Sequence, residues 1–261
     1  MSRSNKGDIL SAGDTITLIA AYAHGETPLA DDSLEIEVVS EGDGWLVIDK
    51  PAGVPVRPHA LDEMGTVLNA VVARYPQIIG VGEGGLRSGI VHRLDTDTSG
   101  TLMVATQQYA WERLRGAFAE HQIQKRYTAL VQGEIDGEGV TRRHLRVAAH
   151  QPARVLVEPE AGGSGDARLC SLGWQVVERF GDRASLVEVD LHTGFLHQVR
   201  VMMAELGHPV IGDTTYGKDT LSIQAPRQML HANSLSLGAI HAEAPIPSDM
   251  QKVLQSIRDD T

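Results

Sequence analysis

The chain has a single cysteine, Cys170, so no disulfide can form within it, and its cysteine and histidines lack the spacing of zinc ligands. We therefore expect a reducing compartment, the cytoplasm, and no structural metal. No stretch approaches the roughly 18 consecutive apolar residues that cross a bilayer, and the first residues, MSRSNKGDILSAGD, lack the apolar core of a secretory signal. The sequence predicts a soluble, uncleaved protein with no membrane partner.

Positive charge is also scarce. The chain has 23 Lys and Arg against 34 Asp and Glu, a net charge of -11, which argues against indiscriminate binding to polyanions. A nucleic-acid partner would need a local basic surface. One candidate is the run 141–155, which has no carboxylate and contains Arg142, Arg143, Arg146 and Arg154. A solvated face is the ordinary alternative for such a run, and composition leaves both readings open.

The 261 residues, 42% of them hydrophobic, are enough for one large domain or for one domain with an appendage. Apolar alternation predicts strands at 45–50, 125–133 and 185–191, and apolar residues at helical spacing predict helices at 66–75, 107–120 and 199–206. The glycine-rich stretch 80–89 is expected to be a mobile loop. Strands with a few interspersed helices, without regular alternation, favour an α+β fold.

The stretch VHRLDTDTSGTL, residues 91–102, places two carboxylates two positions apart. It matches the first half of a calcium-binding EF-hand loop, but the twelfth position, which should be a chelating glutamate, is Thr106. A phosphatase-type aspartate would need a second acidic motif downstream, and none follows. The remaining reading from the residues alone is a turn capped by Asp97, Thr98 and Ser99, which presents Asp95.

HRLDTDTSG (92–100) resembles the signature of the RluA-type RNA pseudouridine synthases. Further stretches are similar to other motifs of that family, in the same order, from about residue 45 to the C-terminus. They are VIDKPAGVPVRP (47–58), KRYTALVQG (125–133), TGFLHQVRVMMAELGHPVIGDTTYG (193–217) and RQMLHA (227–232). Because several ordered motifs agree, we treat the resemblance as a strong signal.

The resemblance implies the pseudouridine synthase fold, a mixed and mostly antiparallel sheet with flanking helices around one central catalytic cleft. It implies an isomerase that converts uridine to pseudouridine in structured RNA, ribosomal or transfer RNA, without cofactor or metal. Asp95 would be the nucleophile or charge partner, and Arg200 the cation that keeps it ionised. Tyr127 would stack on the uracil and relay a proton, and Leu230 would pack on the other face of the base.

The resemblance also implies residues that handle the RNA. Arg93 would fill the place of the extruded uridine or hold a phosphate, and His92 would brace the loop. Three further residues, read as shaping the cleft or contacting RNA, are Lys50, His197 and Gln198. The basic run with Arg142, Arg143 and Arg146 would add grip on the substrate. A monomer is the simplest expectation.

The chain departs from the family pattern in two places. Phe195 and Leu196 stand where an arginine and a threonine are usual, which removes one cation from the expected RNA contacts. Residues 1–30 form an N-terminal extension in which ILSAGDTITLIA (9–20) resembles the last strand of a small S4-like RNA-binding domain, so only a remnant is expected before the catalytic domain at 31–261. The alternative function is a catalytically silent RNA-binding or ribosome-assembly protein on the same fold.

Overall fold

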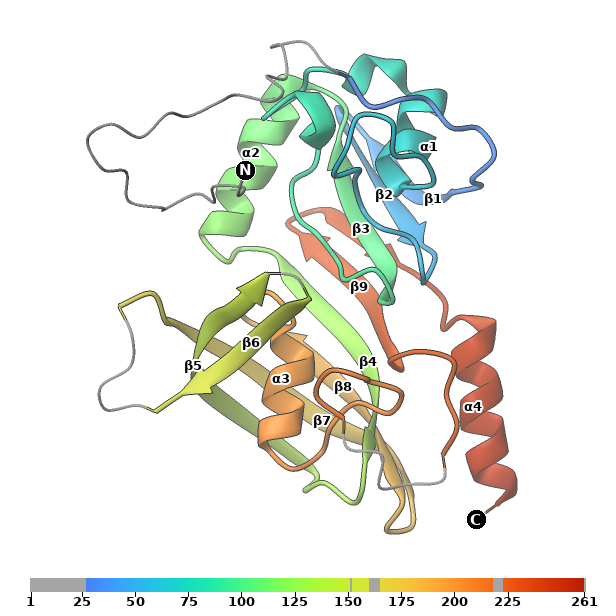
Figure 1. Cartoon of the computed structure of the whole chain (residues 1–261), viewed down its shortest axis with the longest axis vertical. Coiled ribbons are helices and arrows are strands. Elements are labelled where there is room, and N and C mark those ends of the chain that lie inside the picture. The colour runs from blue at the N-terminus through green and yellow to red at the C-terminus, as the bar shows by residue number, and fades with distance from the viewer. Residues whose placement is uncertain (1–26, 151, 160–164, 218–222, 261) are drawn as a thin grey trace, which may run out of the picture.

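The computed structural model describes residues 27–150, 152–159, 165–217 and 223–260 (Figure 1). Within these ranges ten strands form one sheet, in the order β1-β2-β3-β9-β4-β8-β7-β5-β6, with β10 paired to β9. The strands are β1 (Glu37–Gly42), β2 (Trp45–Lys50), β3 (Ser99–Ala105), β4 (Gln124–Gln132), β5 (Glu138–His150), β6 (Ala153–Glu158), β7 (Arg168–Phe180), β8 (Ala184–Leu191), β9 (Leu230–Leu237) and β10 (Ile240–Glu243).

The β3–β9 pair is parallel, and the other strand pairs of this sheet are antiparallel. Neighbouring strands joined by short connections, such as β1–β2 and β7–β8, pair directly because a tight turn can only return the chain antiparallel. The parallel pair instead joins segments about 130 residues apart and lies at the middle of the sheet. The predicted α+β fold with a mixed, mostly antiparallel sheet is confirmed.

Among the described residues, four α-helices cover the two faces of the sheet, as the alternation of side chains along the strands requires. They are α1 (Val67–Arg74), α2 (Gln108–Ala119), α3 (Gln198–Glu205) and α4 (Ser248–Asp259). Leu46 and Ile48 of β2 belong to the core cluster under α1 and α3, whereas Val47 between them belongs to the cluster under α2. Helix α4 packs on a third cluster, on the same face as α2, through Leu130 of β4.

The expected secondary structure is largely confirmed. The helix predicted at 66–75 is α1, in which Thr66 accepts the Asn69 N–H as N-cap and Pro76 follows the last turn. The strands predicted at 45–50, 125–133 and 185–191 are β2, β4 and β8, and the other two helices are α2 and α3. Helix α4 was not foreseen, and the stretch 80–89 contains a short 3₁₀ turn, Gly85–Arg87.

The similarity of residues 9–20 to a strand of an S4-like domain lies outside the described residues. The division into an extension and a catalytic domain at residue 31 therefore remains a prediction. Within the described ranges, the helices are too short or too polar to span a bilayer.

Candidate active site

A cavity of about 770 Å³ opens between the α1 half and the α3 half of the sheet. This volume lies in the range of pockets that enclose drug-sized ligands, about 300–1,000 Å³. In the described part of the chain, its wall contains three carboxylates, Glu83, Asp95 and Asp97. It contains six arginines, Arg57, Arg87, Arg93, Arg115, Arg200 and Arg227. The cavity is therefore basic in a chain that is acidic overall, and it supplies the local basic surface that a nucleic-acid partner needs.

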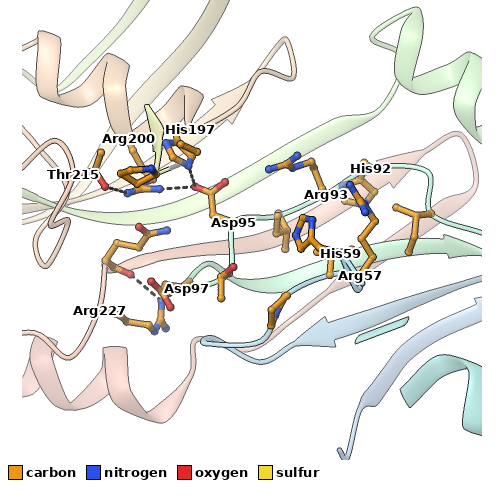
Figure 2. A pocket seen from close by; sticks show the side chains of 18 of the residues that line it. Arg57, His59, His92, Arg93, Asp95, Asp97, His197, Arg200, Thr215 and Arg227 are labelled. Carbon is orange, nitrogen blue, oxygen red and sulfur yellow. Dashed lines mark hydrogen bonds and ion pairs between the residues drawn. The ribbon is translucent and has the colours of Figure 1, made fainter. Parts of the chain in front are cut away.

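Asp95 projects into this cavity from the loop that leads into β3 (Figure 2). The Thr98 N–H donates to the Asp95 carbonyl oxygen at 3.1 Å and closes the loop as a turn. Gly100, just after it, has a φ of +111°, and a Cβ there would collide with the Ala232 backbone of β9. A glycine is required because it combines a conformation that side chains disfavour with close backbone approach. The turn thus sets the position of Asp95 against the middle of the sheet.

Arg200 of α3 joins Asp95 to a second carboxylate, Asp213. Its Nη1 donates to Asp95 Oδ2 at 2.9 Å, and its Nε and Nη2 donate to the two oxygens of Asp213 at 2.7 and 3.0 Å. Burial by itself lowers the pKa of Arg200, but the bonds and charge of Asp213 and then of Asp95 outweigh it, so the pKa lies above its usual value. The prediction that Arg200 pairs with Asp95 is confirmed in the geometry.

The burial of Arg200 does not follow from the apolar pattern of its helix. It lies off the apolar stripe of α3, which usually means exposure, yet the residue is 6% exposed. The buried carboxylate of Asp213 makes this arrangement stable, since a buried guanidinium needs a paired anion. Asp213 also accepts the backbone N–H groups of Thr215 and Tyr216, so its own position is fixed.

His197 lies beside this ion pair, immediately before α3. Its Nδ1 is 2.9 Å from the Tyr216 hydroxyl, and its Nε2 is 3.9 Å from Asp95 Oδ2. Burial lowers the pKa of His197 despite the nearby carboxylate of Asp95. The residue adopts a φ of +53°, which is uncommon for a side chain other than glycine. His197 lines the cavity together with Asp95.

Tyr127 of β4 and Leu230 of β9 lie in the hydrophobic core cluster beneath the cavity rather than in its wall. They are 8% and 3% exposed. Burial, and next the charge of Asp95, raise the pKa of the Tyr127 phenol above its usual value, so the hydroxyl is neutral at physiological pH. Neither side chain lines the cavity, so a base would have to enter more deeply to touch them. Contact of Tyr127 or Leu230 with a base stays a prediction.

Arg93 lies on the other side of Asp95 from Arg200, together with Arg57 (Figure 2). Arg93 is exposed and, in the described part of the chain, forms no ion pair. Arg57 is half-buried, and its pKa is lowered by burial and then by the charges of Arg87 and Arg93. This side of the cavity therefore holds positive charge that the protein itself only partly balances, through Glu83 on Arg87 at 2.7 Å.

Lys50 and Gln198 support residues around the cavity but do not line it. Lys50 is fully buried, and its Nζ donates to the carbonyl oxygens of Pro51, Val54 and Thr96 at 2.7–2.8 Å. Burial lowers the pKa of Lys50 to about 7. Gln198 is 2% exposed and bonds to the loop at 193–195. Of the two roles expected for these residues, the bonds inside the protein favour cleft-shaping, and RNA contact by either residue stays a prediction.

His92 supports the same loop, as expected. Its Nε2 accepts the Met103 N–H at 2.8 Å, and its ring stacks on Phe118 with centroids 4.5 Å apart. Burial lowers the pKa of His92 to about 3, so the imidazole is neutral at physiological pH. The residue joins the segment before Asp95 to β3 and α2.

The basic run on β5 does not join Asp95. Arg142, Arg143 and Arg146 are absent from the cavity wall. Strand alternation places Arg142 and Arg146 on the face opposite the buried Leu145, which packs toward α3. Arg146 is also paired with Glu158 at 2.6 Å. These three arginines therefore do not line the cavity, and their contact with RNA stays a prediction.

Three important residues were not singled out from the sequence, namely Asp213, Arg57 and Arg227. Each lies within a stretch that resembles a family motif, so position in a motif was the available signal. A pattern cannot say that Asp213 would meet Arg200 in the folded chain. Among the described residues, no three His, Cys, Asp or Glu side chains are grouped so that they could hold a metal ion.

Comparison with known proteins agrees with this geometry. The family described as RNA pseudouridylate synthase matches residues 44–205. The "Ribosomal large subunit pseudouridine synthase D" of Nitrosomonas europaea is 32% identical over 95% of this chain and 72% of its own length. The protein of the same name from Pseudomonas aeruginosa is 35% identical over 97% of this chain and 81% of its own length.

Solved structures give the same fold. Human RNA Pseudouridylate Synthase Domain Containing 4 matches with a TM-score of 0.66 and 20% identity, over 85% of this chain and 92% of that one. Human RNA Pseudouridylate Synthase Domain Containing 1 matches with a TM-score of 0.61 and 26% identity, over 86% and 95%. Fold, site and relatives together define an isomerase that acts on uridine in RNA. The chain belongs to the RluA-type RNA pseudouridine synthase family.

Proposed function

We propose that this chain converts a uridine of structured RNA to pseudouridine with Asp95 as the reactive carboxylate. The bond between N1 of the uracil and C1′ of the ribose breaks, the base turns, and C5 bonds to C1′. C5 then loses its proton and N1 gains one, so the reaction is an isomerisation. The observation that carries the proposal is the carboxylate of Asp95, held 2.9 Å from Arg200 inside a cavity walled by arginines.

The geometry supports a division of roles around the carboxylate. A bound base would exclude water from the Asp95 carboxylate, which disfavours its charged form, and the guanidinium of Arg200 stabilises that form. Tyr127 is proposed to pack on the uracil and to move a proton in the last step, since its hydroxyl remains protonated. Leu230 is proposed to hold the opposite side of the base.

Arg93 and Arg57 are proposed to hold the RNA strand next to the reactive uridine. Extruding a base costs a few kcal/mol, and a guanidinium can take its place or bind the adjacent phosphate. The side of the cavity that they form has positive charge in excess. Burial lowers the pKa of Arg57, the charges of Arg87 and Arg93 lower it further, and a phosphodiester would offset that repulsion. The relatives named for the large ribosomal subunit support ribosomal RNA of that subunit as the first substrate to test.

The test is a site map of pseudouridine. Ribosomal RNA from a strain that lacks the protein is incubated with the purified chain, and pseudouridine is located by chemical derivatisation and reverse-transcription stops. We expect a new site with the unchanged protein and none with Asp95→Asn. Asp97→Asn is the matched control, because it neutralises the neighbouring exposed carboxylate, and the site should still appear.

The same map decides against the proposal if RNA binds but no site appears with the unchanged protein. That result would favour the alternative, a catalytically silent RNA-binding or assembly protein on this fold. Phe195, which replaces a usual arginine and packs partly buried on the core, is the feature that keeps this alternative in view. A site that persists in Asp95→Asn would instead refute the role of Asp95 alone.

A further inference from the structure

The loop that presents Asp95 is held by two side chains that lie 130 and 132 positions later in the chain than their partners. Gln228 Nε2 donates to Thr98 Oγ1 at 2.9 Å, and His231 Nδ1 lies 2.9 Å from Ser99 Oγ. These atoms are buried and lie at the parallel contact of β3 and β9. The position of the catalytic loop is thus decided partly by the segment at 227–231 and by whatever fixes that segment.

Arg227 is the centre of this support. Its Nη1 donates to the carbonyl oxygens of Asp97 at 3.0 Å, Gln228 at 2.9 Å and Leu230 at 3.2 Å, and its Nη2 donates to Ser99 Oγ at 3.2 Å. Its side chain is only 7% exposed. One guanidinium therefore joins the loop after Asp95 to the start of β9.

Asp249, in the first turn of α4, fixes this guanidinium. Its Oδ2 accepts from Arg227 Nε at 2.6 Å and its Oδ1 from Nη2 at 3.1 Å, a two-point contact that sets the plane of the group. The Met250 N–H donates to the same Oδ1 at 2.8 Å, so the carboxylate is itself held in place. A connected path runs from α4 through Asp249 and Arg227 to the loop of Asp95.

Arg227 also lies in the cavity wall, so a direct contact with RNA must be weighed. A guanidinium has five N–H donors. Here one donates from Nε to Asp249, those of Nη1 are shared by three carbonyl oxygens, and those of Nη2 go to Ser99 and Asp249. No donor is left for a phosphate. The arrangement suits a residue that holds protein, and not one that binds substrate.

We propose that Arg227 is a positioning residue for Asp95 and that Asp249 holds it in register from the C-terminal helix. The inference rests on the proposed function of Asp95. Lys50 is the opposite anchor of the same loop, because its Nζ donates to the carbonyl oxygen of Thr96. Two successive carbonyl oxygens, of Thr96 and Asp97, are therefore held by cations from different segments. If either contact were lost, Asp95 would be held less firmly against Arg200.

The test compares Asp249→Asn with a matched control, the loss of another carboxylate that binds an arginine at α4. Glu178→Gln removes the carboxylate that binds Arg258 of α4 at 2.6 and 3.0 Å, a two-point contact far along the helix from the loop. Single-turnover rate and affinity for the RNA substrate are measured for both. A displacement of a catalytic group by about 1 Å costs on the order of 10²-fold in rate. We expect Asp249→Asn to lower the rate roughly tenfold or more, with RNA affinity within about twofold of the unchanged protein, and Glu178→Gln to change neither.

Arg227→Lys adds a second readout. It keeps the charge but not the planar fork, so it should lower the rate like Asp249→Asn and leave affinity unchanged. A normal rate in both variants overturns the proposal. So does a loss of affinity at normal rate, which would mean that Arg227 binds RNA directly.

Amide hydrogen exchange separates this inference from the proposed function. The Thr98 N–H, bonded to Asp95, should exchange faster in Asp249→Asn than in Glu178→Gln, whatever RNA is used. If the unchanged protein modifies no RNA, the proposed function fails, and exchange still reports on the loop. Equal exchange in the two variants contradicts the positioning role even if the enzyme is active. Thermal melting confirms that each variant is folded.

Discussion

Asp213 offers the sharpest test of how the ion pair at Asp95 is built. Its side chain is fully buried, and its two oxygens accept four hydrogen bonds, two from Arg200 and one each from the N–H groups of Thr215 and Tyr216. In Asp213→Asn one of those oxygens becomes an NH₂ group. If Oδ1 keeps its three donors, the new amide faces Arg200 Nε, and two donors then meet where one bond of 2.7 Å stood.

The size of the effect follows from burial. Removing one partner of a buried ion pair costs about 3–5 kcal/mol, because the other charge stays buried and uncompensated. At about 2–4 °C per kcal/mol for a chain of this size, the melting temperature should fall by roughly 6–20 °C. Arg200 would also lose the Nε bond to Asp213 that helps to aim its Nη1 at Asp95, so we expect kcat to fall on the order of 10²-fold.

The assay pairs thermal or urea unfolding with turnover on the RNA substrate. Asp190→Asn is the control, because Asp190 pairs with Arg126 at 3.1 Å on the surface, with both side chains more than half exposed. That change should cost no more than about 1 kcal/mol and leave kcat unaltered. A melting temperature of Asp213→Asn that matches the control, together with normal kcat, would refute the reasoning about Arg200.

Two further predictions concern RNA binding and pH. Arg57→Ala should weaken RNA binding at unchanged kcat and reduce the slope of log affinity against log salt by about 0.7–0.9, the effect of one phosphate. The joint replacement of Arg142, Arg143 and Arg146 should also lower this slope if these arginines bind RNA outside the cavity. An unaltered slope in either variant rejects the contact with RNA at that site. The pKa of His92 is lowered to about 3, so between pH 6.5 and 3 the unfolded chain takes up a proton that the folded chain refuses, and stability falls as pH falls. From pH 7 to 5 the unchanged protein should lose about 2 kcal/mol more unfolding free energy than His92→Gln, measured in urea, and equal losses would contradict this assignment.

Local patterns foretold the secondary structure well because they depend on near neighbours. The alternation at 185–191 and the apolar spacing at 199–206 reflect which face of an element is buried, and β8 and α3 follow them. Helix α4 was not predicted, although Met250, Val253, Leu254 and Ile257 recur at helical spacing and give it one buried face.

Residues with charge were harder to place, for a physical reason. Whether an arginine is exposed, paired or aimed at a site depends on which distant carboxylate it meets, and chain position says little about that. Arg200 lies off the apolar stripe of α3 and is nevertheless buried, because it pairs with the buried carboxylate of Asp213. The arginines of β5 were expected to bind the substrate, but they are absent from the cavity wall, and strand alternation places Arg142 and Arg146 on the face opposite the buried Leu145.

By itself the sequence determined the class of fold, the order of the motifs and the aspartate that carries the proposed chemistry, since these depend on local pattern and on motif similarity. Only the tertiary structure decided which cations surround Asp95 and what holds them. Arg200 is 105 positions from Asp95, and Arg227 is 130 positions from the carbonyl of Asp97. Contacts at that separation arise from the parallel meeting of β3 and β9 and from the docking of α3 and α4, which no local pattern contains.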